Sequence, residues 1–310
     1  MNVARSIDEV IFDENSIVTV GSFDGVHLGH CSIIEQVTRR AREQKARAVV
    51  ITFDPHPREV VGRGPVKLLS TLEERLVIIS GLGIDTTIVL PFTYKFSRLT
   101  SKEFYEQYVI KKIGVREVIE GHDHMFGRDR EADIATLDTI GKYYGFNVIK
   151  AQPVMDAGEI VSSSKIREAL MRGDVDKAEQ FLGRPYSLTG VVIKGDRRGE
   201  QLGFPTANIQ PSADKKLVPA EGVYVVAVEY DLKHYFGMLN IGVRPTFSSM
   251  QERVIEVHIF NVTESLYTKQ LTIGFLKRLR PETKFSSREQ LIDQLHRDKN
   301  ESINYIRTLS

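Results

Sequence analysis

The stretch at 21–30 reads GSFDGVHLGH and concentrates groups that can do chemistry. It sets Asp24, His27 and His30 among glycines in a short turn. Imidazole and carboxylate groups together suit zinc or iron, imidazole N–H groups donate to phosphoryl oxygens, and polar loop histidines also occur without any function. These residue types leave a metal site, an anion site and simple packing open.

The spacing of these residues favours the anion site. H-x-x-H on a turn is not the i, i+4 histidine pair of a helical zinc site. Gly21, Gly25 and Gly29 let the backbone approach a ligand closely, and the turn leads into a helix whose free amides attract phosphate. We therefore predict that His27 and His30 stabilise charge on a phosphate.

GSFDGVHLGH resembles the G-x-F-D-x-x-H-x-G-H motif of the nucleotidyltransferase superfamily, Rossmann-like α/β enzymes that transfer a nucleotidyl group from ATP or CTP and release pyrophosphate. VSSSKIREAL at 161–170 is similar to the I-S-S-T-x-I-R signature, which holds the terminal phosphates. By itself this segment reads as a helix N-cap with an exposed basic face. The resemblance implies that His27 and His30 are catalytic. It implies an ATP site made by Gly21, Phe23, Asp24, His27, His30, Ser163, Ser164 and Arg167.

Two further segments resemble the bacterial bifunctional riboflavin kinase/FMN adenylyltransferases, also called FAD synthetases: TFDPHP at 52–57 and EGHDHMFGRDR at 120–130. In that family the second segment, typically G-x-D-F-x-F-G, forms part of the flavin nucleotide pocket. The resemblance implies that Asp123 and Phe126 bind FMN. His124 replaces an aromatic residue of the family pattern. His56 and His124 read equally well as polar loop histidines.

A second glycine-rich stretch, GDRRGEQLGFPTANI, occupies 195–209. Its glycines suit a loop that closes over phosphates, and the hydroxyl of Thr206 with the amide oxygen of Asn208 can complete a Mg²⁺ shell with ATP phosphates and waters. Taken alone, PTAN also reads as a turn. The expected ATP-binding residues of this loop are Gly195, Gly199, Gly203, Pro205, Thr206 and Asn208.

The segments after this loop follow in riboflavin kinase order, so the resemblance spans about 16–305. In that family the glutamate of an E-x-H strand is the catalytic base, which implies this role for Glu256. Strand alternation puts Ile255 and Val257 on a face that packs in the barrel and leaves Glu256 on the other face, free to meet a hydroxyl. Without the family pattern, a strand glutamate more often points to water.

The elements that position these motifs differ between the two parts of the chain. From residue 16 to about 155, β-branched runs alternate with helical stretches, which predicts a mostly parallel sheet with ligands beyond the carboxyl ends of its strands. Thr71 with Glu74 and Thr100 with Glu103 have capping-box spacing. The expected strands are 16–23, 47–53, 86–92, 116–121 and 147–154.

Two short helices, 162–173 and 174–183, precede a change of pattern to closely spaced strands, which favours an antiparallel sandwich or barrel. The strands expected here are 187–195, 222–230, 235–243, 253–260 and 269–276. Ser286 and Glu289 have capping-box spacing and predict a terminal helix. We therefore expect an α/β chain of two domains. Residues 1–183 form a Rossmann-like FMN adenylyltransferase domain with a parallel sheet, and residues 184–310 form an antiparallel β-barrel riboflavin kinase domain with a terminal helix.

The composition fits this reading. The chain has 310 residues, 41% of them hydrophobic, and a net charge of only +1, so neither half is basic enough to indicate nucleic acid as a partner. No stretch approaches the ~18 apolar residues of a membrane span, and the first residues carry acids where a signal peptide needs an apolar run. We expect a cytoplasmic protein with no membrane partner. No coiled-coil heptads are visible, so no oligomeric state is predicted.

The resemblance implies two reactions with ATP as co-substrate and Mg²⁺ as cofactor. The barrel would phosphorylate riboflavin to FMN, and the N-terminal domain would adenylylate FMN to FAD with release of pyrophosphate. Three other readings stay open on the residues alone. They are an adenylyltransferase acting on another phosphate ester, a flavin, nucleotide or RNA sensor without turnover, and a metal-dependent hydrolase.

Overall fold

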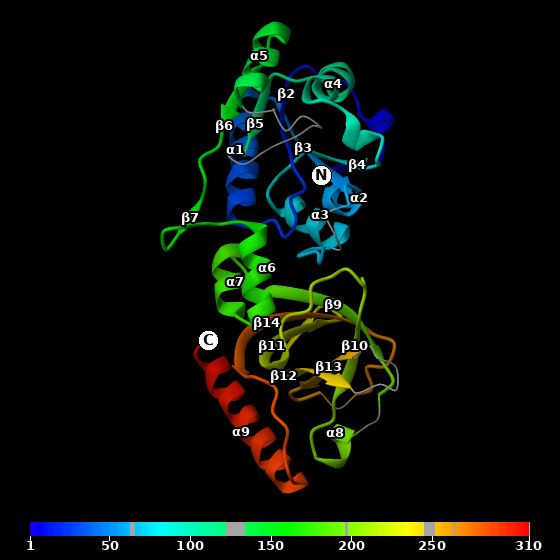
Figure 1. Cartoon of the computed structure of the whole chain (residues 1–310), viewed down its shortest axis with the longest axis vertical. Helices are drawn as coiled ribbons and strands as arrows, with labels where there is room; N and C mark the ends of the chain where they lie inside the picture. The colour runs from blue at the N-terminus through cyan, green and yellow to red at the C-terminus, as the bar shows by residue number, and fades with distance from the viewer. Residues whose placement is uncertain (63–65, 122–133, 196–197, 245–251, 263, 310) are drawn as a thin grey trace. The chain divides into compact units, whose positions relative to one another are not determined.

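The computed structural model describes residues 1–62, 66–121, 134–195, 198–244, 252–262 and 264–309 (Figure 1). The chain divides into two compact units, Met1–Ser163 and Ser164–Ser310. The helices α6 (Ser163–Arg172) and α7 (Val175–Leu182) therefore fall mainly in the second unit, although the sequence motif that opens α6 reads as part of the adenylyltransferase domain.

The first unit contains a six-stranded parallel sheet in the order β1-β4-β3-β2-β5-β6, which confirms the predicted α/β architecture. The short edge strand β1 lies outside the predicted set. The strands are β1 (Asn2–Ala4), β2 (Ser16–Val20), β3 (Arg47–Asp54), β4 (Thr86–Pro91), β5 (Glu117–Glu120) and β6 (Asn147–Lys150), and a small hairpin follows at β7 (Met155–Asp156) and β8 (Glu159–Ile160). The helical segments are η1 (Ile7–Glu9), α1 (Leu28–Gln44), α2 (Pro57–Val60), α3 (Leu72–Gly81), η2 (Phe96–Arg98), α4 (Ser101–Phe104), η3 (Tyr105–Ile113) and α5 (Ile134–Tyr144).

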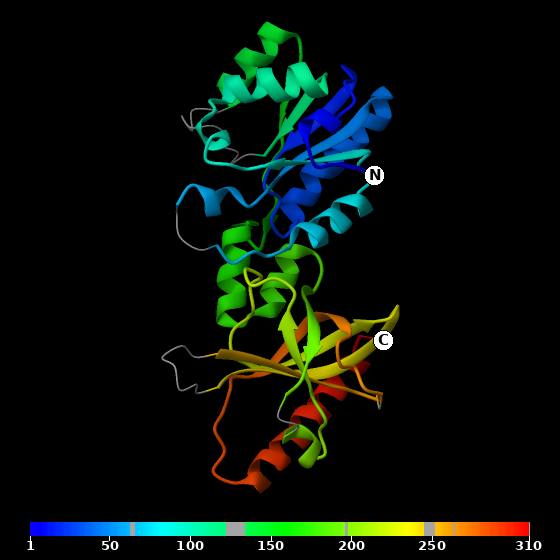
Figure 2. The same cartoon turned by 90° about the vertical axis from the view of Figure 1, so that its right-hand side faces the viewer.

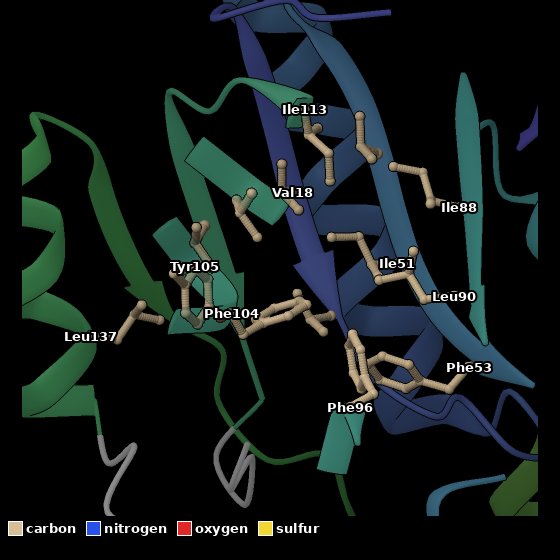
Figure 3. Close-up of a cluster of buried hydrophobic side chains, with 14 of the residues drawn as sticks. Val18, Ile51, Phe53, Ile88, Leu90, Phe96, Phe104, Tyr105, Ile113 and Leu137 are labelled. Carbon is tan, nitrogen blue, oxygen red and sulfur yellow. The ribbon is translucent and has the colours of Figure 1, made fainter. Parts of the chain in front are cut away.

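Both faces of this sheet are buried, as the continuous β-branched runs of a parallel sheet require. On one face Val18 and Ile51 pack with Phe104 and Tyr105 (Figure 3). On the other face the strands pack with Ile34 and its neighbours on α1. The sheet is thus a rigid support for the loops at its carboxyl edge, and β2 and β5 are the strands between which the chain order reverses.

The predicted capping boxes are both present. The Thr71 hydroxyl accepts from the Glu74 N–H while the Glu74 carboxylate accepts from the Thr71 N–H, and Thr100 with Glu103 repeats the arrangement. Each cap stabilises its helix by about 1 kcal/mol. These local signals therefore place the starts of α3 and α4 correctly.

The second unit contains a closed six-stranded antiparallel barrel in the order β10-β13-β12-β11-β14-β9 (Figure 2). The pairing of β9 with β10 closes it, which decides between the barrel and the sandwich. The elements are β9 (Tyr186–Ile193), α8 (Arg198–Gln201), β10 (Ala207–Pro211), β11 (Gly222–Tyr230), β12 (Lys233–Arg244), β13 (Glu252–Ile259), β14 (Gln270–Arg280) and α9 (Arg288–Arg307).

The terminal helix α9 begins one serine later than predicted. Its N-cap is Ser287, whose hydroxyl accepts from the Gln290 N–H at 3.2 Å. Ser286 instead donates its hydroxyl to the Gln290 side-chain oxygen at 2.9 Å. The choice of Ser286 and Glu289 as the capping pair was wrong, because neighbouring serines offer two overlapping cap patterns and only the extended backbone of Ser287 satisfies the first turn.

Candidate active sites

The turn after β2 is tightly constrained. Phe23 and Val26 adopt left-handed backbone conformations, with φ of 47° and 38°, and both side chains are buried. Such a conformation is strained for a β-branched residue, and strain of this kind concentrates at functional sites. A Cβ on Gly21 would lie 3.1 Å from the Phe23 ring, so glycine leaves the space that this ring fills.

His27 and His30 form a stacked pair at the start of α1. Their ring centroids lie 3.7 Å apart with an interplanar angle of 16°. Nδ1 of His27 accepts from the backbone N–H of His30 at 3.3 Å, so the neutral His27 ring carries its proton on Nε2. A Cβ on Gly29 would come within 3.1 Å of the His27 ring. The two predicted histidines therefore do lie together, and the Nε2–H of His27 is left as a hydrogen-bond donor.

His30 is kept neutral by its surroundings. Burial lowers its pKa well below the usual value, and the charges of His27 and Arg75 lower it further. Its Nδ1 is buried and has no hydrogen-bond partner within the described parts of the chain. A neutral ring with an unused nitrogen is suited to receive or orient a ligand rather than to repel one.

Arg75 is a buried cation that the sequence analysis missed. It is 1% exposed, and its Nη1 donates to the Thr52 hydroxyl at 2.9 Å and to the Phe53 carbonyl at 3.0 Å. The signal was present, because Arg75 follows the buried Leu72 at helical spacing on the packed side of α3. Its positive charge supports an anion at this edge of the sheet.

Asp24 is 1% exposed and holds the turn in place. Its carboxylate accepts from the Leu69 N–H at 3.0 and 3.1 Å and from the Ser70 N–H at 2.9 Å. Its backbone carbonyl accepts from the Ser163 hydroxyl at 3.0 Å, which brings the start of the second motif to the turn. Asp24 thus anchors both neighbouring segments, and its contact with ATP stays a prediction.

The remaining predicted residues of this site are not all brought together. Ser164 and Arg167 belong to the second unit, so their approach to the histidines stays a prediction. Asp123 and Phe126 lie outside the described residues, as does His124. His56 is 6% exposed and caps α2 by accepting from the Arg58 N–H, which gives it a local structural role.

The second predicted cluster is assembled by neighbouring barrel strands. Asn208 of β10 is the cross-strand partner of Glu256 of β13, and on the other side Asn240 of β12 also pairs with Glu256. Ile255 and Val257 are 3% and 1% exposed, whereas Glu256 is half-buried and lines a pocket. The predicted alternation along this strand is confirmed.

This pocket has a volume of about 390 Å³, within the usual range for small-molecule sites. Its polar lining includes Thr206, Glu256 and Glu282, while Leu291 and Leu295 of α9 contribute apolar surface. Burial raises the pKa of Glu282, and the charges of Glu221 and Glu256 add to that effect while Arg280 and Asn240 oppose it. The pocket lining thus includes the carboxylates of Glu256 and Glu282 as well as an apolar surface from α9.

Two glycines of the loop lie directly against the predicted metal ligands. A Cβ on Gly195 would overlap the Asn208 side-chain amide. A Cβ on Gly199 would overlap the Phe204 carbonyl and come within 3.0 Å of the Thr206 hydroxyl. Gly203 has a φ of +80°, which favours glycine. Gly195 and Gly199 let the loop approach the two oxygen donors more closely than any other residue could.

Two family models match this chain. FAD synthetase matches residues 10–165, and riboflavin kinase matches residues 182–306. The chain belongs to the bifunctional riboflavin kinase/FMN adenylyltransferase family. It is therefore an enzyme of flavin cofactor biosynthesis, with the adenylyltransferase part first and the kinase part second.

Curated members of the family are similar along nearly their full length. The Bacillus subtilis bifunctional riboflavin kinase/FMN adenylyltransferase is 36% identical over 95% of this chain and 93% of its own. The Escherichia coli (strain K12) protein of the same description is 32% identical over 92% and 91%. A crystal structure described as a macrolide-efflux protein from Streptococcus pneumoniae is 31% identical, with a TM-score of 0.88 over 97% of this chain and 98% of its own.

No helix in the described part of the flavin enzyme is long and apolar enough to cross a membrane. Among the same residues there is no group of three or more His, Cys, Asp and Glu side chains placed to hold a metal ion.

Proposed function

We propose that the two clusters are the two active sites of this enzyme. Residues 184–310 would transfer the γ-phosphoryl group of ATP to the ribityl 5′-hydroxyl of riboflavin, which yields FMN. Residues 1–183 would transfer AMP from a second ATP to FMN, which yields FAD and pyrophosphate. The observation that carries the proposal is that Glu256 lines a pocket and lies opposite Asn208 on the neighbouring strand, within the region matched by the riboflavin kinase family.

In the kinase site, Glu256 accepts the proton of the 5′-hydroxyl as the oxygen attacks the γ-phosphorus. The bond between the γ-phosphorus and the β,γ-bridging oxygen breaks, and ADP leaves with the electron pair. Because Glu256 lies in a half-buried pocket rather than in bulk water, its carboxylate can be held next to the substrate hydroxyl. Alignment and charge neutralisation supply most of the rate gain in such transfers.

The residues present fit a magnesium ion. Thr206 and Asn208 offer a hydroxyl and an amide oxygen, hard ligands of the kind that Mg²⁺ prefers, and the glycines packed against them leave no side chain in the way. When bound with ATP, the ion neutralises charge on the phosphates. Thr206 and Asn208 hold it, and the loop with Gly195, Gly199 and Gly203 surrounds the phosphates.

In the adenylyltransferase site, an oxygen of the FMN phosphate attacks the α-phosphorus of ATP. A bond from that oxygen to the α-phosphorus forms, the bond to the α,β-bridging oxygen breaks, and pyrophosphate carries away the electron pair. His27 and His30 stabilise the charge that develops on the triphosphate. Ser163, Ser164 and Arg167 hold the leaving pyrophosphate.

The test is one incubation of the full chain with riboflavin, ATP and Mg²⁺, in which riboflavin, FMN and FAD are separated over time. The proposal requires FMN to form before FAD and pyrophosphate to match FAD in amount. Conversion of added FMN to FAD without any phosphorylation of riboflavin would overturn the kinase assignment. No turnover of either flavin would overturn both assignments and favour a binding protein.

The cellular setting follows from the substrates. Both reactions consume ATP, and we propose a cytoplasmic location and small-molecule partners, namely riboflavin, FMN and ATP. Neither half of the chain carries a large excess of basic residues, which supports a role without nucleic acid. Fractionation of cells that express the chain, with FAD formation as the readout, tests the location.

A further inference from the structure

His258 links the strand of the proposed catalytic base to the loop of the proposed metal ligands. It lies two residues after Glu256 on β13 and is 8% exposed. Its Nδ1 lies 2.8 Å from the backbone carbonyl oxygen of Pro205, the residue before Thr206. A carbonyl oxygen can only accept, so Nδ1 carries the proton and donates it.

This hydrogen bond continues the attachment of the loop where the strand pairing ends. β10 begins at Ala207, and its ladder with β13 pairs Ala207 with Val257 and Asn208 with Glu256. Pro205 and Thr206 precede the ladder, and Pro205 has no backbone N–H to donate. The His258 side chain thus takes the place of a further rung: it lies one residue after Val257 and reaches Pro205, two residues before Ala207.

The His258 ring is itself held from several sides. Phe204 and Phe260 pack edge-on against it with ring centroids 5.5 and 5.6 Å away. Lys299 of α9 places its Nζ 5.9 and 5.8 Å from the centres of these two phenyl rings. A ring packed in this way has little freedom to tilt, so its N–H direction is preset.

The protonation state agrees with this arrangement. Burial lowers the pKa of His258, the bond to Pro205 opposes that effect, and the charge of Lys299 on α9 lowers the pKa further. Pro205 on the loop and Lys299 on the terminal helix are thus the two groups that, besides burial, shift the pKa of the His258 ring. The ring is neutral near pH 7 and still donates through Nδ1.

We propose that His258 is a positioning residue for riboflavin phosphorylation, which sets Thr206 at a fixed distance from Glu256 by holding the Pro205 carbonyl. The proposal rests on the roles assigned above to Glu256 and Thr206. His258 also lines the pocket that contains Glu256, and in this role it acts through the Pro205 carbonyl rather than on the reacting atoms. It couples the two halves of the kinase site, because one end of the bond lies on the strand of the base and the other on the loop of the oxygen donor.

The test compares two substitutions of His258 in the full chain. His258→Asn keeps an amide N–H close to the position of Nδ1, whereas His258→Leu keeps the bulk and removes the donor. For His258→Leu we expect kcat for FMN formation to fall roughly 10- to 100-fold, because a misplacement of about 1 Å has effects of that order, and the Mg²⁺ concentration for half-maximal rate to rise. His258→Asn should stay within about threefold of the wild-type enzyme, a small change on the same scale.

Two controls belong to the same experiment. His296→Leu removes another ring that packs on Phe204, with a centroid distance of 5.0 Å, and should leave the Mg²⁺ requirement unchanged. Conversion of FMN to FAD by the same samples, which depends on the other active site, reports the amount of protein with a folded first unit, and a urea unfolding curve of each variant reports whether the barrel unit is folded.

A His258→Leu enzyme with unchanged kcat and Mg²⁺ requirement would overturn the proposal. So would a His258→Asn enzyme as impaired as His258→Leu, since packing rather than the N–H would then matter. Glu256→Gln and Thr206→Val are run in parallel to test the underlying roles. If either keeps full kinase activity, the assigned base or metal ligand fails, whatever the His258 variants do.

Discussion

Asn208 and Glu256 face each other as cross-strand partners on β10 and β13. Directly opposed residues of an antiparallel pair have Cβ atoms about 5 Å apart. One such pair therefore brings an oxygen donor suited to Mg²⁺ to the position directly opposite the proposed base, which itself lines the pocket. This relationship makes the kinase site testable one residue at a time.

Glu256→Gln keeps the shape of the side chain and removes its basicity. We expect the rate of FMN formation to fall roughly 10²- to 10⁴-fold, the usual contribution of a general base. Conversion of added FMN to FAD should not change, because that reaction uses the other site. Separating the flavins after incubation with ATP measures both rates, and near-normal FMN formation would remove Glu256 as the base.

Gly195→Ala tests the contact between the glycine loop and Asn208. The added Cβ would overlap the Asn208 amide, so either the loop or the amide must move. We expect the Mg²⁺ requirement of FMN formation to rise and kcat to fall roughly tenfold or more. Gly81→Ala is a matched control, because its Cβ would meet nothing within 4 Å. Equal activity of the two variants would contradict the proposed role of the close contact between Gly195 and Asn208.

His27→Ala and His30→Ala probe the other active site. Each should lower FAD formation from FMN roughly 10²- to 10³-fold, as the loss of one preorganised donor does elsewhere. FMN formation from riboflavin by the same protein should continue and serves as the control for folding. A double variant that still makes FAD at the normal rate would exclude both histidines from catalysis.

Glu120 should make the stability of the chain depend on pH. Burial raises its pKa from 4.5 to about 8, Asp138 adds to that effect, and the hydrogen bond from Tyr105 and the charge of Lys150 oppose it. The folded state therefore binds more protons than the unfolded state between these two values. The contribution to stability is fully present below pH 4.5 and is lost as pH rises through about 8.

The measurement for Glu120 is urea unfolding across this pH range, compared between the wild-type chain and Glu120→Gln. The wild-type free energy of unfolding should fall, relative to the variant, by up to about 1.4 kcal/mol per pH unit. Parallel curves for the two proteins would show that Glu120 titrates normally.

Asp298 should be important for the stability of the barrel unit. Asp298 is 2% exposed. Both oxygens of its carboxylate accept from Arg280 Nε, each at 3.1 Å, and one of them also accepts from Arg280 Nη2 at 2.8 Å. This ion pair ties α9 to β14. Asp298→Ala leaves the guanidinium without its partner and should lower the free energy of unfolding by about 3 kcal/mol. Gln294→Ala, which removes only one donor to Asp298, should lower it by about 1 kcal/mol. Equal effects of the two changes would argue against the ion pair.

Local signals sufficed for much of the fold. The capping boxes at Thr71 and Thr100 were predicted correctly because a cap depends on residues three positions apart. The cap of α9 was misplaced by one residue because Ser286 and Ser287 compete locally. The strands β1 and β10 were missed, since both are short and lack a clear alternation.

The sequence by itself determined the two glycine-rich clusters and the histidine pair, because these depend on residue type and spacing along the chain, and its resemblance to the family predicted the order of the two activities. Only the tertiary structure decided that Asn208 lies opposite Glu256, that Arg75 is buried beside the histidines and that Asp24 anchors its own turn. Strand pairing and burial join residues that are far apart in the chain, and no local pattern specifies which of them meet.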